Sequence, residues 1–404
     1  MTSKFHRARK RRWEQRQREC RELAAIANEI NDPALGKLIS FNFRLMDRFA
    51  AVAIDQARAS YVACSAAAIS ALLVLLVGAT TAMVIDDAAG QITAGAVTAV
   101  GAALGSATPL IMTHGWPGSI VEFSQVVGPL TDPRAHGGDP ADAFHLVLPH
   151  IPGFGLSGPT HETGWEHRRV AAAFGSLMES LGYRRYGTQG GDWGSVISRE
   201  LGRTRPDEVI GVHLNLLPGA HATTEPTAAE LVALDPGERG RLLASWARTR
   251  EWLRDRQGYA DIQSTRPQTL AYGLTDSPVG QLAWIAEKFT EWADPRSGPI
   301  DRDHLLTNVM LYWLTGTAGS SARIYYERAH AAYWGGPPEP SGAPTALAVF
   351  PRDNFIPMRH IAERTNNIVR WTEYERGGHF AALEQPSALV SDIREFFRSL
   401  RSAA

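Results

Sequence analysis

Cysteine is scarce in this sequence: Cys20 and Cys64 are the two cysteines among 404 residues, and neither belongs to a CxxC pair. This scarcity excludes a disulfide framework and a cysteine-based metal site. The net charge is only −1. Residues 1–18 hold eight Lys and Arg residues and one Glu, a charge of +7, so the rest of the chain carries −8. Because the positive charge is confined to a short tail, nucleic-acid binding by the body of the protein is also excluded.

Charge is missing from two long stretches near the N-terminus. Residues 59–85 and 88–107 contain no charged side chain, and only Asp86 and Asp87 separate them. A helix needs about 20 apolar residues to span a bilayer. We therefore expect a basic helical segment, residues 1–58, followed by a transmembrane helical hairpin, residues 59–107. The positive-inside rule then places the N-terminus and everything after the hairpin on the cytoplasmic side. The alternative is a buried, alanine-rich core helix.

After residue 107, short apolar segments alternate with helix-forming ones. Strands are predicted at residues 109–113, 144–148, 346–350 and 368–371, and an amphipathic helix at 166–181. This alternation predicts an α/β fold with a mostly parallel sheet. Residues 218–335 interrupt it with helical sequence rich in Trp and Tyr, which we interpret as a lid over the carboxyl ends of the strands. The predicted organisation is a core in two parts, residues 108–217 and 336–404, with the lid between them.

The strongest chemical signal is Gly190-Gly191-Asp192-Trp193-Gly194. This segment has the form of a nucleophile elbow, a sharp turn from a strand into a helix that exposes a reactive side chain. Serine is the usual nucleophile, but here the position holds Asp192. A carboxylate that attacks a saturated carbon forms an ester that activated water can hydrolyse, whereas a serine would form a stable ether. Asp192 therefore indicates hydrolysis at saturated carbon, on epoxides or alkyl halides.

Two further motifs supply the groups that such a nucleophile needs. His114-Gly115-Trp116-Pro117 follows the first predicted strand, and the backbone N–H groups of Trp116 and Trp193 are candidates for an oxyanion hole. His379, in a Gly-Gly-His-Phe segment, is the candidate general base, and Asp353 is the candidate carboxylate that orients it. The order nucleophile, acid, histidine is that of the α/β-hydrolase fold.

From about Pro109 to Phe397 the sequence resembles the microsomal-type epoxide hydrolases of the α/β-hydrolase superfamily. The segments that carry the resemblance are residues 113–119, 190–195, 259–272, 276–280 and 377–382. The resemblance implies two lid tyrosines that donate hydrogen bonds to the epoxide oxygen. These fall on Tyr259 and Tyr325, with the adjacent Tyr326 as the rival for the second role. Ring opening develops an alkoxide, which a phenol can stabilise or protonate. The resemblance also implies Asp353 as the charge-relay acid and requires no cofactor and no metal.

The sequence departs from this family before residue 108. Family members carry an N-terminal domain that wraps the lid, and two strands ahead of the strand that leads into His-Gly-Trp-Pro. Neither is recognisable here, where residues 1–107 stand in their place. We therefore expect the strand at residues 109–113 to lie at an exposed edge of the sheet, in a core that is less stable than that of a full-length member.

The leading hypothesis is a membrane-anchored epoxide hydrolase that forms an alkyl ester on Asp192 and hydrolyses it with water activated by His379, releasing a vicinal diol. Its partners are then a small epoxide, water and a membrane, but not nucleic acid. One alternative is a membrane-tethered, catalytically impaired remnant that acts as an interaction module. The other is a haloalkane dehalogenase, which the two lid tyrosines disfavour. The sequence leaves open which epoxide is used and the oligomeric state.

Overall fold

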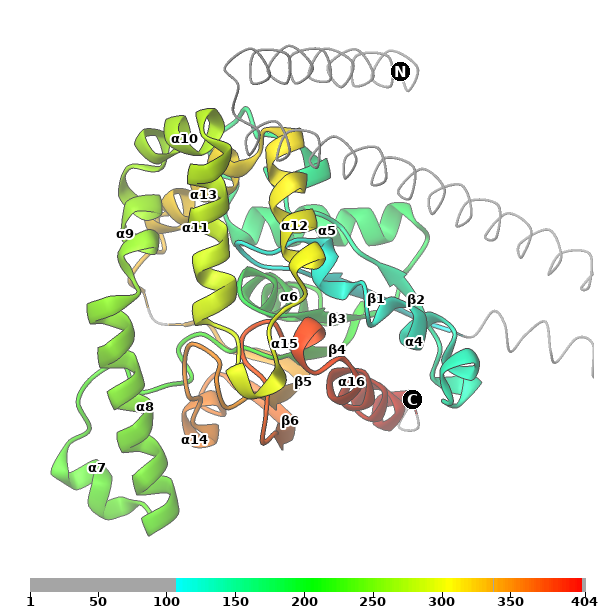
Figure 1. Ribbon diagram of the computed structural model, residues 1–404. Coiled ribbons are helices and arrows are strands. Elements are labelled where there is room, and N and C mark those ends of the chain that lie inside the picture. The colour runs from blue at the N-terminus through cyan, green and yellow to red at the C-terminus, as the bar shows by residue number, and fades with distance from the viewer. Residues whose placement is uncertain (1–106, 337, 402–404) are drawn as a thin grey trace, which may run out of the picture. The chain divides into compact units, whose positions relative to one another are not determined.

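The computed structural model describes residues 107–336 and 338–401, and a parallel sheet forms its centre (Figure 1). The strand order is β2-β1-β3-β4-β5-β6, and each neighbouring pair is parallel. The strands are β1 (Thr108–Thr113), β2 (Phe144–Val147), β3 (Tyr186–Gly190), β4 (Val209–Leu214), β5 (Ser341–Val349) and β6 (Asn366–Glu373). The predicted α/β architecture with a parallel sheet is confirmed.

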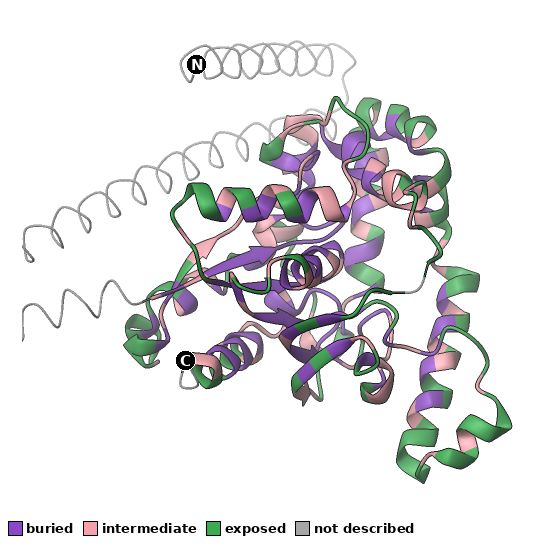
Figure 2. Cartoon of the chain, turned by 180° about the vertical axis from the view of Figure 1, so that it is seen from behind, coloured by how far each residue is buried: buried purple, intermediate pink, exposed green. Residues whose placement is uncertain are grey.

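Helices cover both faces of the sheet, as the alternation of side chains along β1 illustrates. Ile111 packs in a cluster with residues of α5 (His167–Ser180) and α6 (Trp193–Thr204). Its neighbours Leu110 and Met112 pack in a second cluster with residues of α16 (Pro386–Arg401). All three side chains are fully buried. Figure 2 shows the inner strands of the sheet buried along most of their length, whereas β2 and β6 at its edges are only partly buried. A strand covered on both faces needs a continuous apolar run, which is why this segment of the sequence is hydrophobic without alternation.

The expectation that the first strand after residue 107 lies at the sheet edge is wrong. β1 pairs with β2 on one side, where Leu110 faces Leu146, and with β3 on the other, where Leu110 faces Gly187. Among the described strands, β2 occupies that edge instead, because the connection from β1 places it on the side away from β3. β2 has only four residues, and a short edge strand offers little backbone for unwanted pairing.

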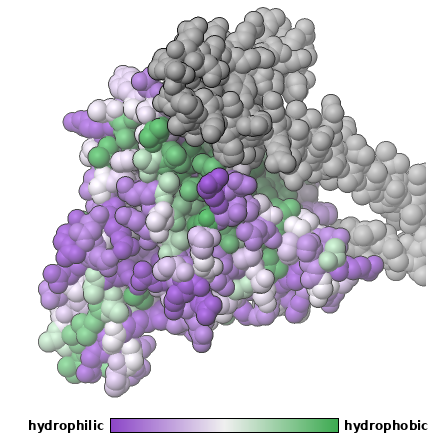
Figure 3. Space-filling model, in the orientation of Figure 1, coloured by the Kyte–Doolittle hydropathy of each residue, from purple (hydrophilic) through white to green (hydrophobic). Residues whose placement is uncertain are grey.

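Among the described residues, seven α-helices lie between β4 and β5, in the segment predicted to form a lid. They are α7 (Ala228–Ala233), α8 (Pro236–Asp255), α9 (Gly258–Thr265), α10 (Pro267–Asp276), α11 (Pro278–Glu291), α12 (Arg302–Thr315) and α13 (Ala318–Ala329). Three of them begin at a proline, which is favoured at the first helical position because its missing N–H would have no partner there. Figure 1 shows α7 and α8 at one end of this layer and α10 and α13 at the other. Hydrophobic residues reach the surface at the α7–α8 end (Figure 3), where Val232 is 79% exposed.

The predicted basic segment, residues 1–58, and the predicted membrane hairpin, residues 59–107, lie outside the described residues apart from Ala107. Within the described ranges, no helix combines the length and the hydrophobicity that a membrane crossing needs.

Candidate active site

Asp192 lies in the sharp turn between β3 and α6. Its backbone angles, φ 50° and ψ −125°, make it the one non-glycine residue with a positive φ in the described part of the chain. Such a conformation costs free energy when a Cβ atom is present, and it is typical of active-site turns. The turn also requires a close approach of two backbones, since a Cβ atom on Gly194 would lie 1.8 Å from the carbonyl oxygen of Thr113. The structure thus places Asp192 in the turn that the glycine pattern predicts.

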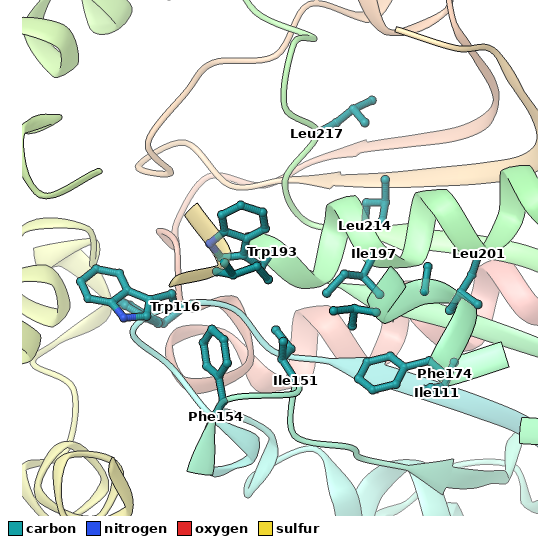
Figure 4. Close-up of a cluster of buried hydrophobic side chains, with 14 of the residues drawn as sticks. Ile111, Trp116, Ile151, Phe154, Phe174, Trp193, Ile197, Leu201, Leu214 and Leu217 are labelled. Atoms are coloured by element: carbon teal, nitrogen blue, oxygen red, sulfur yellow. The ribbon is translucent and has the colours of Figure 1, made fainter. Parts of the chain in front are cut away.

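The loop after β1 contacts this turn directly. Thr113 and Gly190 are partners in the β1–β3 ladder, so the two strands end at the same level. The backbone N–H of Trp116 donates a 2.8 Å hydrogen bond to Oδ1 of Asp192, as expected for half of an oxyanion hole. Trp193 is the first residue of α6, where a backbone N–H has no acceptor within the helix. Figure 4 shows the Trp116 and Trp193 side chains among the residues of a buried hydrophobic cluster.

Two lid residues that sequence patterns did not reveal hold the Trp116 loop in place. The Asn308 side chain donates a 2.8 Å hydrogen bond to the carbonyl oxygen of Pro117, and the Tyr312 hydroxyl donates a 2.5 Å hydrogen bond to that of Gly118. Both lie on α12, about 190 residues further along the chain. An Asn and a Tyr on a helix carry no local signal for such a role. They link the lid to the position of the oxyanion-hole N–H.

His379 is positioned between two carboxylates. Its Nδ1 lies 2.7 Å from Oδ1 of Asp353, and its Nε2 lies 3.6 Å from Oδ2 of Asp192. His379 is 6% exposed and Asp353 is 3% exposed, so water does not screen this pairing well. The backbone N–H of Asn354 donates a 2.7 Å hydrogen bond to Oδ1 of Asp353 and orients that carboxylate. The structure therefore brings together the three residues predicted as nucleophile, base and acid.

The charges around His379 decide its protonation. Burial lowers the pKa of the imidazole, but the carboxylates of Asp353 and Asp192 outweigh that effect and raise the pKa well above its ordinary value. The imidazole of His379 therefore holds its proton more tightly while Asp192 is a free carboxylate. Conversion of Asp192 into a neutral ester removes one of the two negative charges that hold this proton. The same change that forms the ester thus shifts His379 towards the neutral form that can act as a base.

The two predicted lid tyrosines lie against the tryptophans of the oxyanion region. Tyr259, on α9, stacks on Trp116 with ring centroids 5.1 Å apart. Tyr325, on α13, packs edge-on against Trp193 at 4.8 Å and lies 5.9 Å from the Tyr259 ring. Burial and the nearby Asp192 raise the pKa of both phenols, and Tyr259 adds to this effect at Tyr325. Both hydroxyl groups therefore stay protonated and available as hydrogen-bond donors.

The rival Tyr326 does not share this position. It is 37% exposed, and its ring stacks on His330 with centroids 3.9 Å apart. Consecutive residues of a helix point about 100° apart, so only one of the two adjacent tyrosines can face the core. The structure assigns the inward position to Tyr325.

The set of groups supports nucleophilic attack, stabilisation of an oxyanion, proton donation to a leaving oxygen and activation of water. Each of these steps has a side chain or backbone group at a suitable place: Asp192, the Trp116 N–H, the two tyrosines and His379. In the residues that the structure describes, no three His, Cys, Asp or Glu side chains are grouped as metal ligands.

Comparisons with known proteins agree on one family. Residues 108–386 match the model of the alpha/beta hydrolase fold family. The chain is 43% identical over 304 residues to a protein of Stigmatella aurantiaca (strain DW4/3-1), covering 74% of this chain and 66% of that protein. It is 37% identical over 308 residues to epoxide hydrolase 1 of Sus scrofa, covering 72% of this chain and 68% of the relative. The chain thus spans about two thirds of the length of these relatives.

Solved structures show the same similarity. The juvenile hormone epoxide hydrolase of the silkworm Bombyx mori superposes with a TM-score of 0.63 at 30% identity, over 74% of this chain and 73% of that one. The Aspergillus niger epoxide hydrolase superposes with a TM-score of 0.61 at 33% identity, over 73% of each chain.

Proposed function

Because the chain belongs to the epoxide hydrolases of the α/β-hydrolase fold, we propose that it opens epoxides to vicinal diols through a covalent ester on Asp192. The observation that carries this mechanism is the hydrogen bond from the Trp116 N–H to Oδ1 of Asp192, with His379 on the other carboxylate oxygen. A carboxylate held in this way is oriented for attack by its second oxygen.

The first half-reaction forms the ester. Oδ2 of Asp192 attacks one carbon of the epoxide, and the bond from that carbon to the epoxide oxygen breaks. Tyr259 and Tyr325 donate hydrogen bonds to the departing oxygen, and one of them transfers its proton to it. Their raised pKa values keep both phenols protonated until this step. The product is a hydroxyalkyl ester of Asp192.

The second half-reaction hydrolyses the ester. His379 takes a proton from a water molecule, whose oxygen attacks the carbonyl carbon of the Asp192 ester. The negative charge of the tetrahedral intermediate develops on the oxygen that the Trp116 N–H already contacts. The intermediate collapses by breaking the bond between the carbonyl carbon and the alkyl oxygen, which receives the proton from His379. The diol leaves, and the second proton of the water, left on the new carboxyl group of Asp192, passes to the tyrosinate formed in the first half-reaction. Asp192 is then again a carboxylate, carrying one oxygen from water, and both phenols are protonated.

Turnover of a simple aryl epoxide, styrene oxide, by the full-length protein in detergent tests this function. We expect phenylethanediol to form catalytically in the absence of added metal or cofactor. A haloalkane such as 1-chlorobutane should release no halide, since the two phenol donors suit a developing alkoxide. Absence of diol from folded protein, with unchanged styrene oxide, would refute the proposed function.

We further propose that residues 59–107 anchor the enzyme in a membrane with its catalytic part in the cytoplasm. The two uncharged stretches and the basic segment ahead of them support this placement. Carbonate extraction of the membrane fraction is the test, and we expect the protein to stay with the membrane. Its release into the supernatant would rule out an integral anchor.

A further inference from the structure

A small cavity lies beside Asp192 and has a volume of about 10 Å³. A water molecule needs roughly 10–15 Å³ of such space together with polar partners, so this cavity is at the lower limit for one water. Its lining includes the reactive carboxylate, His379, Gly115 and a second acidic residue, Glu122. Neither half-reaction described above uses Glu122.

The backbone fixes Glu122 close to the oxyanion hole. It belongs to a single turn of 3₁₀ helix, η1 (Ile120–Phe123), which directly follows the His-Gly-Trp-Pro loop. The Ser119 hydroxyl caps this turn by accepting a hydrogen bond from the Val121 N–H. The Glu122 side chain turns back over the loop, since a Cβ atom on Gly118 would lie 1.3 Å from its Oε1. Glycine at position 118 therefore leaves the space that the carboxyl group occupies.

The surroundings of Glu122 suit a hydrogen-bonding group better than a fixed charge. Among the described residues, no Lys or Arg forms an ion pair with it within 4.0 Å. Burial raises its pKa to about 8; protonated His379 acts in the opposite direction, and the Asp192 carboxylate adds to the increase. Whether protonated or not, the carboxyl group presents an oxygen that can accept a hydrogen bond from water.

We propose that Glu122 is a positioning residue that holds the hydrolytic water between its carboxyl oxygen, Nε2 of His379 and the ester carbon of Asp192. This inference rests on the proposed function and concerns its second half-reaction. One hydrogen of the water points to His379 and is transferred to it. The other donates a hydrogen bond to Glu122, which fixes the direction of the oxygen lone pair that attacks the ester. Glu122 neither gains nor loses a proton in this step.

Two different substitutions remove the carboxyl group from the cavity. Glu122→Leu replaces it with an apolar side chain, and Gly118→Ala displaces it while leaving Glu122 in the chain. Glu122→Gln is the conservative variant, because its amide keeps a carbonyl acceptor. Gly240→Ala, on α8 where nothing lies within 4 Å of the added Cβ, is the control for a glycine-to-alanine change.

Rapid-quench mass spectrometry with styrene oxide separates the two half-reactions, measuring how fast the ester on Asp192 forms and how fast it disappears. We expect Glu122→Leu and Gly118→Ala to slow ester hydrolysis about tenfold, the effect of losing one hydrogen bond, with ester formation changed less than about threefold. Glu122→Gln should keep ester hydrolysis within about threefold of the parent enzyme. When Gly118→Ala is added to the Glu122→Leu variant, the hydrolysis rate should change little, because both changes remove the same contact.

Three results would overturn the inference. Ester hydrolysis at the parent rate in both Glu122→Leu and Gly118→Ala would show that the carboxyl group is not needed. Equal slowing of both half-reactions in every variant, Glu122→Gln included, would show a purely structural role. If the Glu122→Leu variant does not fold, either of two results is enough to overturn the inference. One is ester hydrolysis at the parent rate in Gly118→Ala, and the other is slow ester hydrolysis in Glu122→Gln. In each of these cases the proposed function still holds as long as the parent enzyme turns over styrene oxide. If the parent enzyme forms no ester on Asp192, the proposed function itself is refuted.

Discussion

The backbone N–H of Trp116 and the Oδ1 atom of Asp192 lie 2.8 Å apart, although 76 residues separate them in the sequence. The contact exists because β1 and β3 are neighbours in the sheet and end at the same level, so the loop after one meets the turn after the other. A nucleophile and an N–H donor held by two adjacent strands need no rearrangement when charge develops during the reaction.

Substitution of Gly115 by alanine should disrupt this contact without breaking the fold. An added Cβ atom would lie 2.4 Å from Oδ1 of Asp192, so the carboxylate or the loop has to move. A misplacement of about 1 Å commonly costs 100-fold in rate, and we expect a loss of about that size in kcat/KM. Steady-state kinetics with styrene oxide measure it. Gly273→Ala, on α10 with nothing within 4 Å of the added Cβ, is the matched control and should behave as the parent enzyme.

Replacement of His379 by glutamine should separate the two half-reactions. Asp192 can still be alkylated, but no base activates water, so ester hydrolysis should fall by roughly 10²–10⁴-fold. Intact-mass spectrometry should then show protein heavier by one molecule of epoxide. Asp192→Ala should form neither adduct nor diol, since it lacks the nucleophile. Rapid, complete turnover by His379→Gln would contradict the assignment of His379 as the base.

The lid tyrosines should act in the first half-reaction. Tyr259→Phe and Tyr325→Phe each remove one donor to the departing oxygen, and we expect ester formation to slow by roughly 10–100-fold in each case. The double variant should be far slower than either single one, because no phenol remains to donate the proton. Tyr326→Phe is the control, since this side chain is 37% exposed and stacks on His330. A loss in Tyr326→Phe equal to that in Tyr325→Phe would reverse the assignment.

A buried ionic network should contribute more to stability than to activity. Asp392, on α16, is 1% exposed; its Oδ2 lies 3.0 Å from Nε2 of His213, and its Oδ1 lies 2.7 Å from Nε of Arg370. Removal of one member of a buried charge network costs about 3–5 kcal/mol, and we expect Asp392→Asn to lower the free energy of unfolding by about that amount. Glu395→Gln removes a half-exposed partner of the same arginine and should cost less than about 1 kcal/mol.

The pH dependence of this loss follows from the sign of the shift. Burial raises the pKa of Asp392, but the hydrogen bonds and charges of its partners outweigh burial, and the folded-state pKa lies well below the ordinary value. A depressed folded-state pKa contributes stability above the unfolded pKa, about 3.9, and this stability is lost as the pH falls towards the folded value. Urea unfolding at pH 7 and below pH 4 should therefore show a larger difference between parent and Asp392→Asn at pH 7. An equal difference at both pH values would contradict this account.

The sequence by itself determined the parallel α/β sheet and the identity of the groups around Asp192. These features have local causes. The turn at Asp192 needs small residues on both sides because backbones approach closely there, and the buried strands need continuous apolar runs. Such requirements are visible in a few neighbouring residues, so Asp192, Trp116, Asp353 and His379 can be predicted from the sequence alone.

Only the tertiary structure decided which groups lie at the active site. Tyr325 and Tyr326 are adjacent and chemically identical, and the packing of α13 alone turns Tyr325 inward. β1 was expected at the sheet edge but lies inside, because strand order depends on the path of the connections and not on position in the chain. Asn308 and Tyr312 reach the oxyanion loop through contacts that no local pattern encodes. Packing between segments that are distant in the sequence sets these positions. The same packing brings the helices between β4 and β5 against the loops that surround Asp192.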